Sequence, residues 1–328
     1  MLRTGTHRTT HSIDIAAPAE TVYAIIADAP AWPVRFAPTL HVERVEGAGE
    51  SQTGQTAHEA RERLRIWATA NGEVKTWTSQ RELDPHNARI RFQQEVSSPP
   101  VSSMGGEWIV TPGDVAGTVR LTLRHEFSAV DDDPAGIEWI TKATDRNSGT
   151  ELANIKTLAE GIGAADGLVF DFEDSTLVAD ADPETVYRFL HEAAAWPDRL
   201  PHVSRMRLTE DVENIQWMVM DTVTKDGSAH TTESVRICFP DSRRIVYKQL
   251  VTPPLMTTHI GEWTVVPTDK GARATSWHRV QLNEDAIVGV LGADATVHEA
   301  KEFIRRAVGG NSAATLALAK TFAEQHHG

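Results

Sequence analysis

Three side chains in one short stretch have the types needed to handle a carbonyl compound. Trp77, Ser79 and Arg81 stand at alternate positions, so on a strand they share one face. An inward Arg81 would need a carboxylate, water, backbone carbonyls or a ligand oxygen as its partner. It could stabilise the enolate or alkoxide of an aldol reaction, while Ser79 holds a carbonyl or a water and Trp77 stacks on a ring. The alternative is an outward Arg81 in surface ion pairs with Glu82 or Glu59.

The second half of the chain carries a related stretch. Residues 231–236 (TTESVR) align with residues 76–81 (TWTSQR), so Thr232, Ser234 and Arg236 repeat the alternate positions. Replacement of the tryptophan by Thr232 predicts a wider or wetter pocket in the second copy. The first copy matches the pattern better and is ranked first. Whether both copies do the same chemistry stays open.

Two histidines occupy matching places in the last strand expected in each copy. His125 lies in Arg-His-Glu-Phe and His278 in Trp-His-Arg-Val. An imidazole at this position could act as general acid or base in a dehydration. A histidine at the pocket rim, or one whose ring is hydrogen-bonded in the core without a catalytic role, explains the pattern equally well.

Four further tryptophans stand at repeated positions and are candidates for the pocket wall. Those after Gly-Glu are expected in the wall or in the core, and those before Pro are expected to cap the pocket or only to pack. They are Trp108 and Trp263 after Gly-Glu, and Trp32 and Trp196 before Pro. Asn147 and Asn311 could face the cavity entrance or cap a helix.

A long internal repeat must position these residues. Residues 17–36 and 181–200 share Glu-Thr-Val-Tyr and Trp-Pro at one offset, and four later blocks match in the same order. A period of this length predicts a duplicated domain and not a solenoid of short repeats. We expect one domain over 1–163 and a second over 170–328.

The sequence pattern of one copy predicts an α+β domain. His7–Ile15 alternates like a strand, Pro18 suits the start of a helix, and Trp32-Pro33 suggests a second short helix. About six antiparallel strands are expected between Leu40 and Val130, with a hairpin at Asn71-Gly72, followed by a long helix over about 135–160. A curved sheet wrapped around that helix would enclose a cavity.

Composition limits the classes of partner and cofactor. A formal net charge of -14 argues against nucleic acid or an anionic membrane as the main partner. The single cysteine, Cys238, excludes a disulfide framework. Without a secretory leader or a long apolar run, the chain is expected in the cytoplasm. No dinucleotide, phosphate-loop or zinc-protease motif occurs, so we expect no cofactor and no metal.

The order of elements, the opening APAETVY, the Trp-Pro pair and the long last helix resemble the Bet v 1/START-like helix-grip superfamily. Two fused copies resemble the di-domain aromatase/cyclases of bacterial type II polyketide synthases. Residues 77–81 (WTSQR) resemble the W-x-S-x-R strand of that family, whose Trp, Ser and Arg line the pocket and whose Arg is central to activity. The resemblance covers nearly the whole chain.

This resemblance implies a function. The protein would direct first-ring aldol closure, between C7 and C12, and aromatisation of a C9-reduced poly-β-ketone bound to an acyl carrier protein. Other synthase subunits would be further partners, and the chemistry needs no cofactor. An acidic carrier protein would need basic stretches, for which the candidates are Arg61, Arg63 and Arg65, or Arg205 and Arg207. The alternative is a non-catalytic carrier of hydrophobic ligands, and one copy could also serve only as a scaffold.

Overall fold

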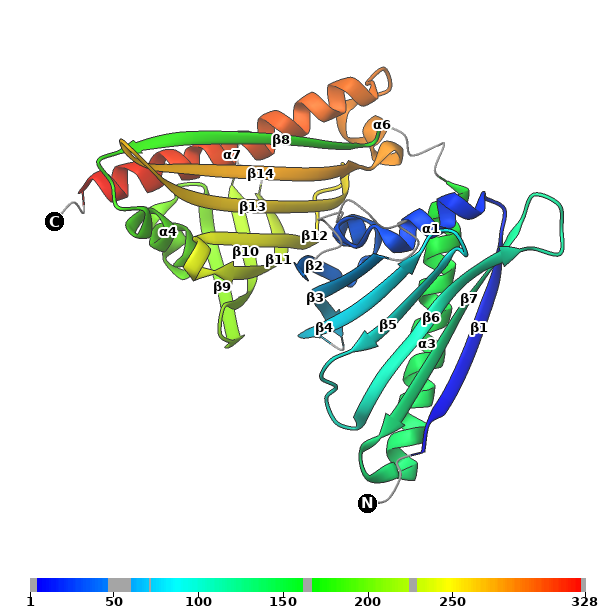
Figure 1. Cartoon of the computed structure of the whole chain (residues 1–328). Coiled ribbons are helices and arrows are strands. Elements are labelled where there is room, and N and C mark those ends of the chain that lie inside the picture. Colours follow the sequence, from blue (N-terminus) through cyan, green and yellow to red (C-terminus); the bar gives the residue numbers. More distant parts are fainter. Residues whose placement is uncertain (1–4, 47–59, 71, 162–166, 224–228, 326–328) are drawn as a thin grey trace. The chain divides into compact units, whose positions relative to one another are not determined.

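The chain divides into two compact units, Met1–Ala165 and Asp166–Gly328, called domain 1 and domain 2 below. The computed structural model describes residues 5–46, 60–70, 72–161, 167–223 and 229–325. Each unit has its own sheet and its own long helix (Figure 1). Within the described residues, no helix is both long and apolar enough to cross a membrane.

Domain 1 is a sheet of seven described antiparallel strands, in the order β1-β7-β6-β5-β4-β3-β2. Neighbours in the sheet are neighbours in sequence, except that β1 pairs with β7. The strands are β1 (His7–Ile15), β2 (Thr39–Glu46), β3 (Ala60–Ala70), β4 (Glu73–Asp84), β5 (Arg89–Gln94), β6 (Val101–Pro112) and β7 (Val119–Ala129). The helices are α1 (Ala19–Ala27), α2 (Trp32–Arg35) and α3 (Pro134–Glu160).

Domain 2 repeats this architecture, with the sheet order β8-β14-β13-β12-β11-β10-β9. Its strands are β8 (Val169–Ala179), β9 (Val203–Val212), β10 (Ile215–Val223), β11 (Ala229–Phe239), β12 (Arg244–Val251), β13 (Met256–Thr268) and β14 (Gly271–Leu282). Its helices are α4 (Pro183–His191), α5 (Trp196–Arg199), α6 (Ile287–Leu291) and α7 (Val297–Gln325). The predicted α+β fold of two tandem helix-grip domains is confirmed.

The alternation of the strands and the spacing of the long helix explain this layering. On β7, Leu121, Leu123 and Phe127 are buried, while Thr122, Arg124 and Glu126 lie on the outer face. On α3, Ile140, Leu152 and Ile155 form a buried stripe at helical spacing. The core of domain 1 therefore lies between the concave face of the sheet and α3, with α1 closing one end.

Candidate active site

Arg81 points into domain 1, and the alternative of an outward Arg81 is wrong. Its side chain is 3% exposed, and Ser79 on the same face of β4 is also buried. The Arg81 guanidinium donates to the carbonyls of Ile26 at 3.2 Å and Ala27 at 2.9 Å, at the end of α1. Its Nε lies 3.1 Å from a carboxylate oxygen of Glu62 on β3. Arg81 thus joins the sheet to the last turn of α1.

Arg236 occupies the matching place in domain 2 but has fewer partners. Its side chain is 1% exposed, and Nη2 donates to the carbonyl of Leu190 at 2.5 Å at the end of α4. Nε and Nη1 have no hydrogen-bond acceptor among the residues that the structure describes. Burial lowers the pKa of Arg236. Ser234 and Thr232, on the same face of β11, are buried as expected from the alternation.

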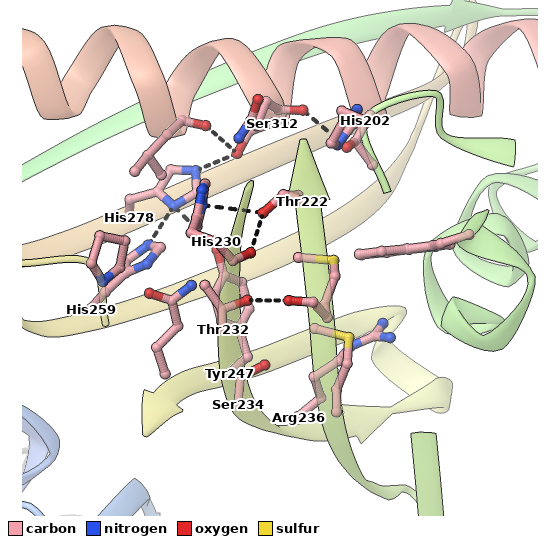
Figure 2. A pocket seen from close by; sticks show the side chains of 18 of the residues that line it. His202, Thr222, His230, Thr232, Ser234, Arg236, Tyr247, His259, His278 and Ser312 are labelled. Carbon is pink, nitrogen blue, oxygen red and sulfur yellow. Dashed lines mark hydrogen bonds between the residues drawn. The ribbon is translucent and has the colours of Figure 1, made fainter. Parts of the chain in front are cut away.

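His278 is the centre of a polar network in domain 2 (Figure 2). Its Nδ1 lies 3.0 Å from Nε2 of His259 and 3.2 Å from the hydroxyl of Tyr247. Its Nε2 lies 2.9 Å from the hydroxyls of both Ser276 and Ser312. Burial lowers the pKa of His278 to about 4, so the imidazole is neutral near pH 7 and can accept a proton.

Four elements bring this network together. Tyr247 comes from β12, His259 from β13, Ser276 and His278 from β14, and Ser312 from α7. The two strand residues His259 and His278 have hydrogen-bonded rings 5.3 Å apart between centroids, and burial and the neighbouring imidazole lower the pKa of His259 to about 3. The network therefore holds two neutral imidazoles against three hydroxyls.

Four members of the network, all except Ser276, line a cavity of about 120 Å³ between the sheet and α7. Polar groups, sulfur and aromatic rings share its lining, as is usual for a site that both orients and encloses a small molecule. Besides the network, the cavity is lined by Trp196, His202, Met218, Met220, Thr222, His230, Thr232, Ser234, Arg236, Gln249, Pro253, Met256, Trp263, Val308, Asn311 and Thr315.

Domain 1 keeps a serine, Ser148, at the position of Ser312 but replaces the other three partners of the histidine with apolar side chains. The sheet registers and the internal repeat place Phe92 at the position of Tyr247, and Met104 at that of His259. Leu123 likewise stands where domain 2 has Ser276. The copies therefore differ most beside the histidine that they share.

The shared histidine of domain 1, His125, has no such neighbours. Its ring meets Phe92 edge-on at 5.6 Å, and its Nδ1 has no hydrogen-bond partner among the described residues. Burial, with a smaller contribution from His11, lowers the pKa of His125 to about 4. His125 lines a second hollow, of about 820 Å³, whose other walls are mostly charged residues of the outer face such as Arg91 and Glu107.

The repeated tryptophans lie where pocket or core residues are expected. Trp196 and Trp263 line the domain 2 cavity, and Trp108 is buried in the core of domain 1. The rings of Trp32 and Trp196 lie under the guanidinium groups of Arg81 and Arg236, at 5.1 and 5.2 Å. Trp77 is partly exposed and packs against a small apolar cluster that includes Leu64.

The two asparagines do not cap helices, which corrects that alternative. Asn147 lies in the middle of α3 and Asn311 in the middle of α7, where Asn311 lines the cavity.

Glu151 of α3 is a further candidate in domain 1. In the internal repeat it aligns with Thr315, which lines the cavity of domain 2. Burial raises the pKa of Glu151 to about 7, so domain 1 holds a carboxyl that titrates near neutrality.

Five residues at these sites are not among those predicted from the sequence: His259, Tyr247, Ser276, Glu62 and Glu151. The internal repeat contained the signal for most of them, because a polar residue in one copy aligns with an apolar or uncharged residue in the other. His259, for instance, stands two residues before the Gly-Glu-Trp shared by both copies, where domain 1 has methionine. Within the described ranges, no three His, Cys, Asp or Glu side chains are placed to hold a metal ion.

Comparison with protein families identifies two matching segments. Residues 6–160 and 170–324 each match the family described as polyketide cyclase/dehydrase and lipid transport. A curated relative, the granaticin polyketide synthase bifunctional cyclase/dehydratase of Streptomyces violaceoruber, is 42% identical over 97% of this chain and 95% of its own length. The actinorhodin polyketide synthase bifunctional cyclase/dehydratase of Streptomyces coelicolor is 42% identical over 96% of each chain.

Solved structures show the same two-domain architecture. The di-domain ARO/CYC BexL, from the BE-7585A biosynthetic pathway, is 47% identical with a TM-score of 0.83, over 97% of this chain and 99% of its own. The di-domain ARO/CYC StfQ, from the steffimycin biosynthetic pathway, is 32% identical with a TM-score of 0.80, over 97% and 98% of the two chains. The similarity thus extends through both copies of the fold.

Proposed function

Because this chain belongs to the polyketide cyclase/dehydrase family, with one family segment in each domain, we propose that its second domain is the reaction chamber of an aromatase/cyclase. The substrate would be a poly-β-ketone, and the reaction an aldol closure of the first ring followed by dehydration. The observation that carries this proposal is the cavity of domain 2, which holds both a neutral histidine in a hydroxyl network and a buried guanidinium with unused N–H groups.

The groups in the cavity suit the two chemical steps. In the aldol step a base removes a proton from carbon, and the resulting enolate carbon attacks a ketone, whose oxygen gains negative charge. His278 would accept the proton, directly or through the hydroxyl of Tyr247 or Ser312, and Arg236 would stabilise the oxygen. The protonated His278 would then give this proton to the alkoxide, which completes the aldol step. In the dehydration, His278 would take a second proton from the carbon beside the new hydroxyl and pass it to that hydroxyl, which departs as water as the C=C bond forms. His278 thus ends neutral as it began.

The finer substrate assignment is also part of the proposal. We infer closure between C7 and C12 of a chain reduced at C9 and tethered to an acyl carrier protein, and its support is the resemblance to the di-domain aromatase/cyclases. Names of relatives that refer to polyketide synthases favour association with other synthase components. Of the proposed docking residues, Arg61 and Arg63 already pair with Glu82 and Glu95 on the outer face.

The interior of domain 1 favours a second role, that of binding part of the polyketide substrate. Its interior presents Phe92, Met104 and Leu123 where domain 2 presents hydrogen-bonding groups. An apolar interior with a charge-paired arginine suits binding of a hydrophobic segment better than proton transfer. Burial raises the pKa of Glu151 on α3 to about 7, so Glu151 would be the candidate acid of domain 1.

A reconstituted minimal synthase with its ketoreductase tests the proposal. Adding the wild-type protein should shift the products from shunt compounds to the aromatised first ring, as measured by liquid chromatography and mass spectrometry. The variant Tyr247→Phe/His259→Met/Ser276→Leu places domain 1 residues in domain 2 and should lose the shift while keeping its melting temperature near that of the wild type. An unchanged mixture of products on adding the wild-type protein would rule the cyclase function out.

A further inference from the structure

One residue on the strand beside each buried arginine differs in charge between the two domains. In domain 1, Glu62 of β3 stands directly opposite Arg81 of β4 in the sheet register. In domain 2, Gln216 of β10 stands opposite Arg236 of β11. Both side chains are buried, at 5% and 2% exposed, so neither can exchange its partner for bulk water.

In domain 1 the guanidinium has a carboxylate partner. One oxygen of Glu62 contacts Arg81, the other lies 2.7 Å from Nε of Arg44, and the two α1 carbonyls of Ile26 and Ala27 take the Nη groups of Arg81. Tryptophan covers one face of the group. Nε of Arg81 makes no hydrogen bond among the described residues, but the Glu62 carboxylate at 3.1 Å balances the charge of the guanidinium, so an anionic ligand oxygen gains little beside Arg81.

In domain 2 the neutral glutamine leaves the guanidinium without a carboxylate at ion-pair distance among the described residues. The Gln216 amide donates to Glu210 at 2.9 Å and to the carbonyl of His191 at 3.3 Å, and so turns toward other partners. Arg236 keeps one carbonyl contact and retains Nε and Nη1 without an acceptor among the described residues. Glu210 acts on Arg236 only from beyond ion-pair distance, and a buried cation without a close carboxylate is costly, so an anionic oxygen of a ligand would be preferred beside it.

We propose that Gln216 makes domain 2 the copy that binds an anionic oxygen, an enolate or a phenolate, on the free edge of Arg236, and that Glu62 closes the same subsite in domain 1. This inference rests on the proposed function for the identity of the ligand and adds the residue that selects the domain. Glu62 and Gln216 are positioning residues, because they act through the arginines and do not touch the ligand.

Binding of 7-hydroxycoumarin to the full chain tests this assignment. The phenol and phenolate of this dye absorb at different wavelengths, so a pH titration of the bound dye reports which form the protein prefers. Wild-type protein should bind the phenolate about tenfold more tightly than the phenol, a shift of about one unit in the pKa of the dye. Arg236→Met should abolish the preference.

Substitutions at Gln216 and Glu62 test whether these two residues decide which domain binds the phenolate. Gln216→Glu/Glu210→Gln moves one carboxylate beside Arg236 at constant net charge and should remove the phenolate preference, whereas Gln216→Met should keep it. Glu62→Gln should add a second phenolate site, raising the stoichiometry from one to two per chain. Thermal melts of each variant confirm that it is folded.

The outcome is independent of catalysis. If the wild-type protein fails to bind the phenolate preferentially, or if the Gln216→Glu/Glu210→Gln protein binds it as well as the wild type, the inference is wrong. Because the dye titration involves no synthase, either result stands whether or not the protein alters the products of the reconstituted system.

Discussion

At the scale of single residues, the two arginines share a position but differ in what surrounds them. Arg81 is held by a carboxylate and two carbonyls, so its removal leaves Glu62 buried beside only Arg44. Arg236 has one carbonyl partner and faces the cavity. We therefore expect Arg81 to contribute mainly to stability and Arg236 mainly to the proposed chemistry.

Alanine substitutions should separate these roles. Arg81→Ala should lower the free energy of unfolding by about 3–5 kcal/mol, because it breaks a buried ion pair. Arg236→Ala should lower kcat/KM by about 10²–10³, the usual effect of losing a group that stabilises a developing oxyanion. Chemical denaturation and the product assay measure the two effects. Equal losses of activity in both variants at equal stability would contradict the distinction.

The buried histidines predict how stability depends on pH. Burial lowers the pKa of His125 and of His278 to about 4, and burial with the neighbouring His278 lowers that of His259 to about 3. The folded protein thus binds fewer protons than the unfolded chain below about pH 6.5. Stability should be complete above that pH and should fall progressively between about pH 6.5 and pH 4.

The variant His259→Met measures one part of this dependence. It removes one titrating group, so the slope of unfolding free energy against pH should decrease by up to one proton, about 1.4 kcal/mol per pH unit. Urea denaturation at a series of pH values between 4 and 8 gives the slope. An unchanged slope would mean that His259 is protonated equally in both states.

The sequence could predict which residues face inward but not what each one meets. Alternation along one strand predicts a common face for Trp77, Ser79 and Arg81, and the burial of Ser79 and Arg81 agrees with it, while Trp77 is partly exposed. The carboxylate beside Arg81 comes from another strand, and its position depends on the pairing register of β3 with β4. Periodicity within a strand carries no information about that register.

At the scale of elements, a glycine in β13 allows two strands to place their side chains together. A Cβ built on Gly261 would lie 2.2 Å from the ring of Tyr247, so the ring rests directly on the glycine backbone. Tyr247 on β12 stands opposite Gly261 in the register and reaches His278 on β14 across it. The strand thus leaves room for a contact between its two neighbours.

Gly261→Ala should disrupt this contact while keeping the fold. The added methyl group would displace the ring of Tyr247 and cost about 1–3 kcal/mol of stability, as overpacking does. Product formation should fall to the level of Tyr247→Phe, because the hydroxyl no longer reaches His278. Gly289→Ala, where a Cβ would meet nothing within 4 Å, is the matched control and should retain full activity. Full activity in Gly261→Ala would exclude a role for the Tyr247 contact.

Elements with strong local signals were predictable. The long helix expected over about 135–160 is α3 (Pro134–Glu160), and the hairpin expected at Asn71-Gly72 joins β3 to β4, although residue 71 lies outside the described part of the chain. The cavity was predicted only in general terms, because the order of elements does not fix the size of side chains. The apolar set of Phe92, Met104 and Leu123 required comparison of the two copies in space.

At the scale of the whole molecule, the chain is two units with separate cores. The buried apolar clusters each draw their residues from one unit, for example Val22 and Leu121 in domain 1 and Val186 and Leu316 in domain 2. Separate cores allow separate cooperative transitions. The duplication therefore makes it possible to destabilise one domain and observe the other.

Differential scanning calorimetry should detect this independence. Arg81→Ala should lower the transition of domain 1 by about 10 °C, given a loss of several kcal/mol in a unit of this size, and should leave the transition of domain 2 in place. Leu316→Ala, a truncation in the core of domain 2, serves as the reciprocal variant. A single transition that moves as a whole in both variants would show that the units unfold together.

The exchange of Glu62 for Gln216 also has a genetic consequence. Every glutamate codon becomes a glutamine codon through one change of base, from G to C at the first position. After a gene duplication, a point mutation of this kind in either half would suffice to give the two arginines different electrostatic surroundings while leaving the backbone, the strand pairing and the shape of the side chain intact. A mutational library that samples only this position in each half would therefore be a minimal means of moving a reaction from one half of a duplicated gene to the other.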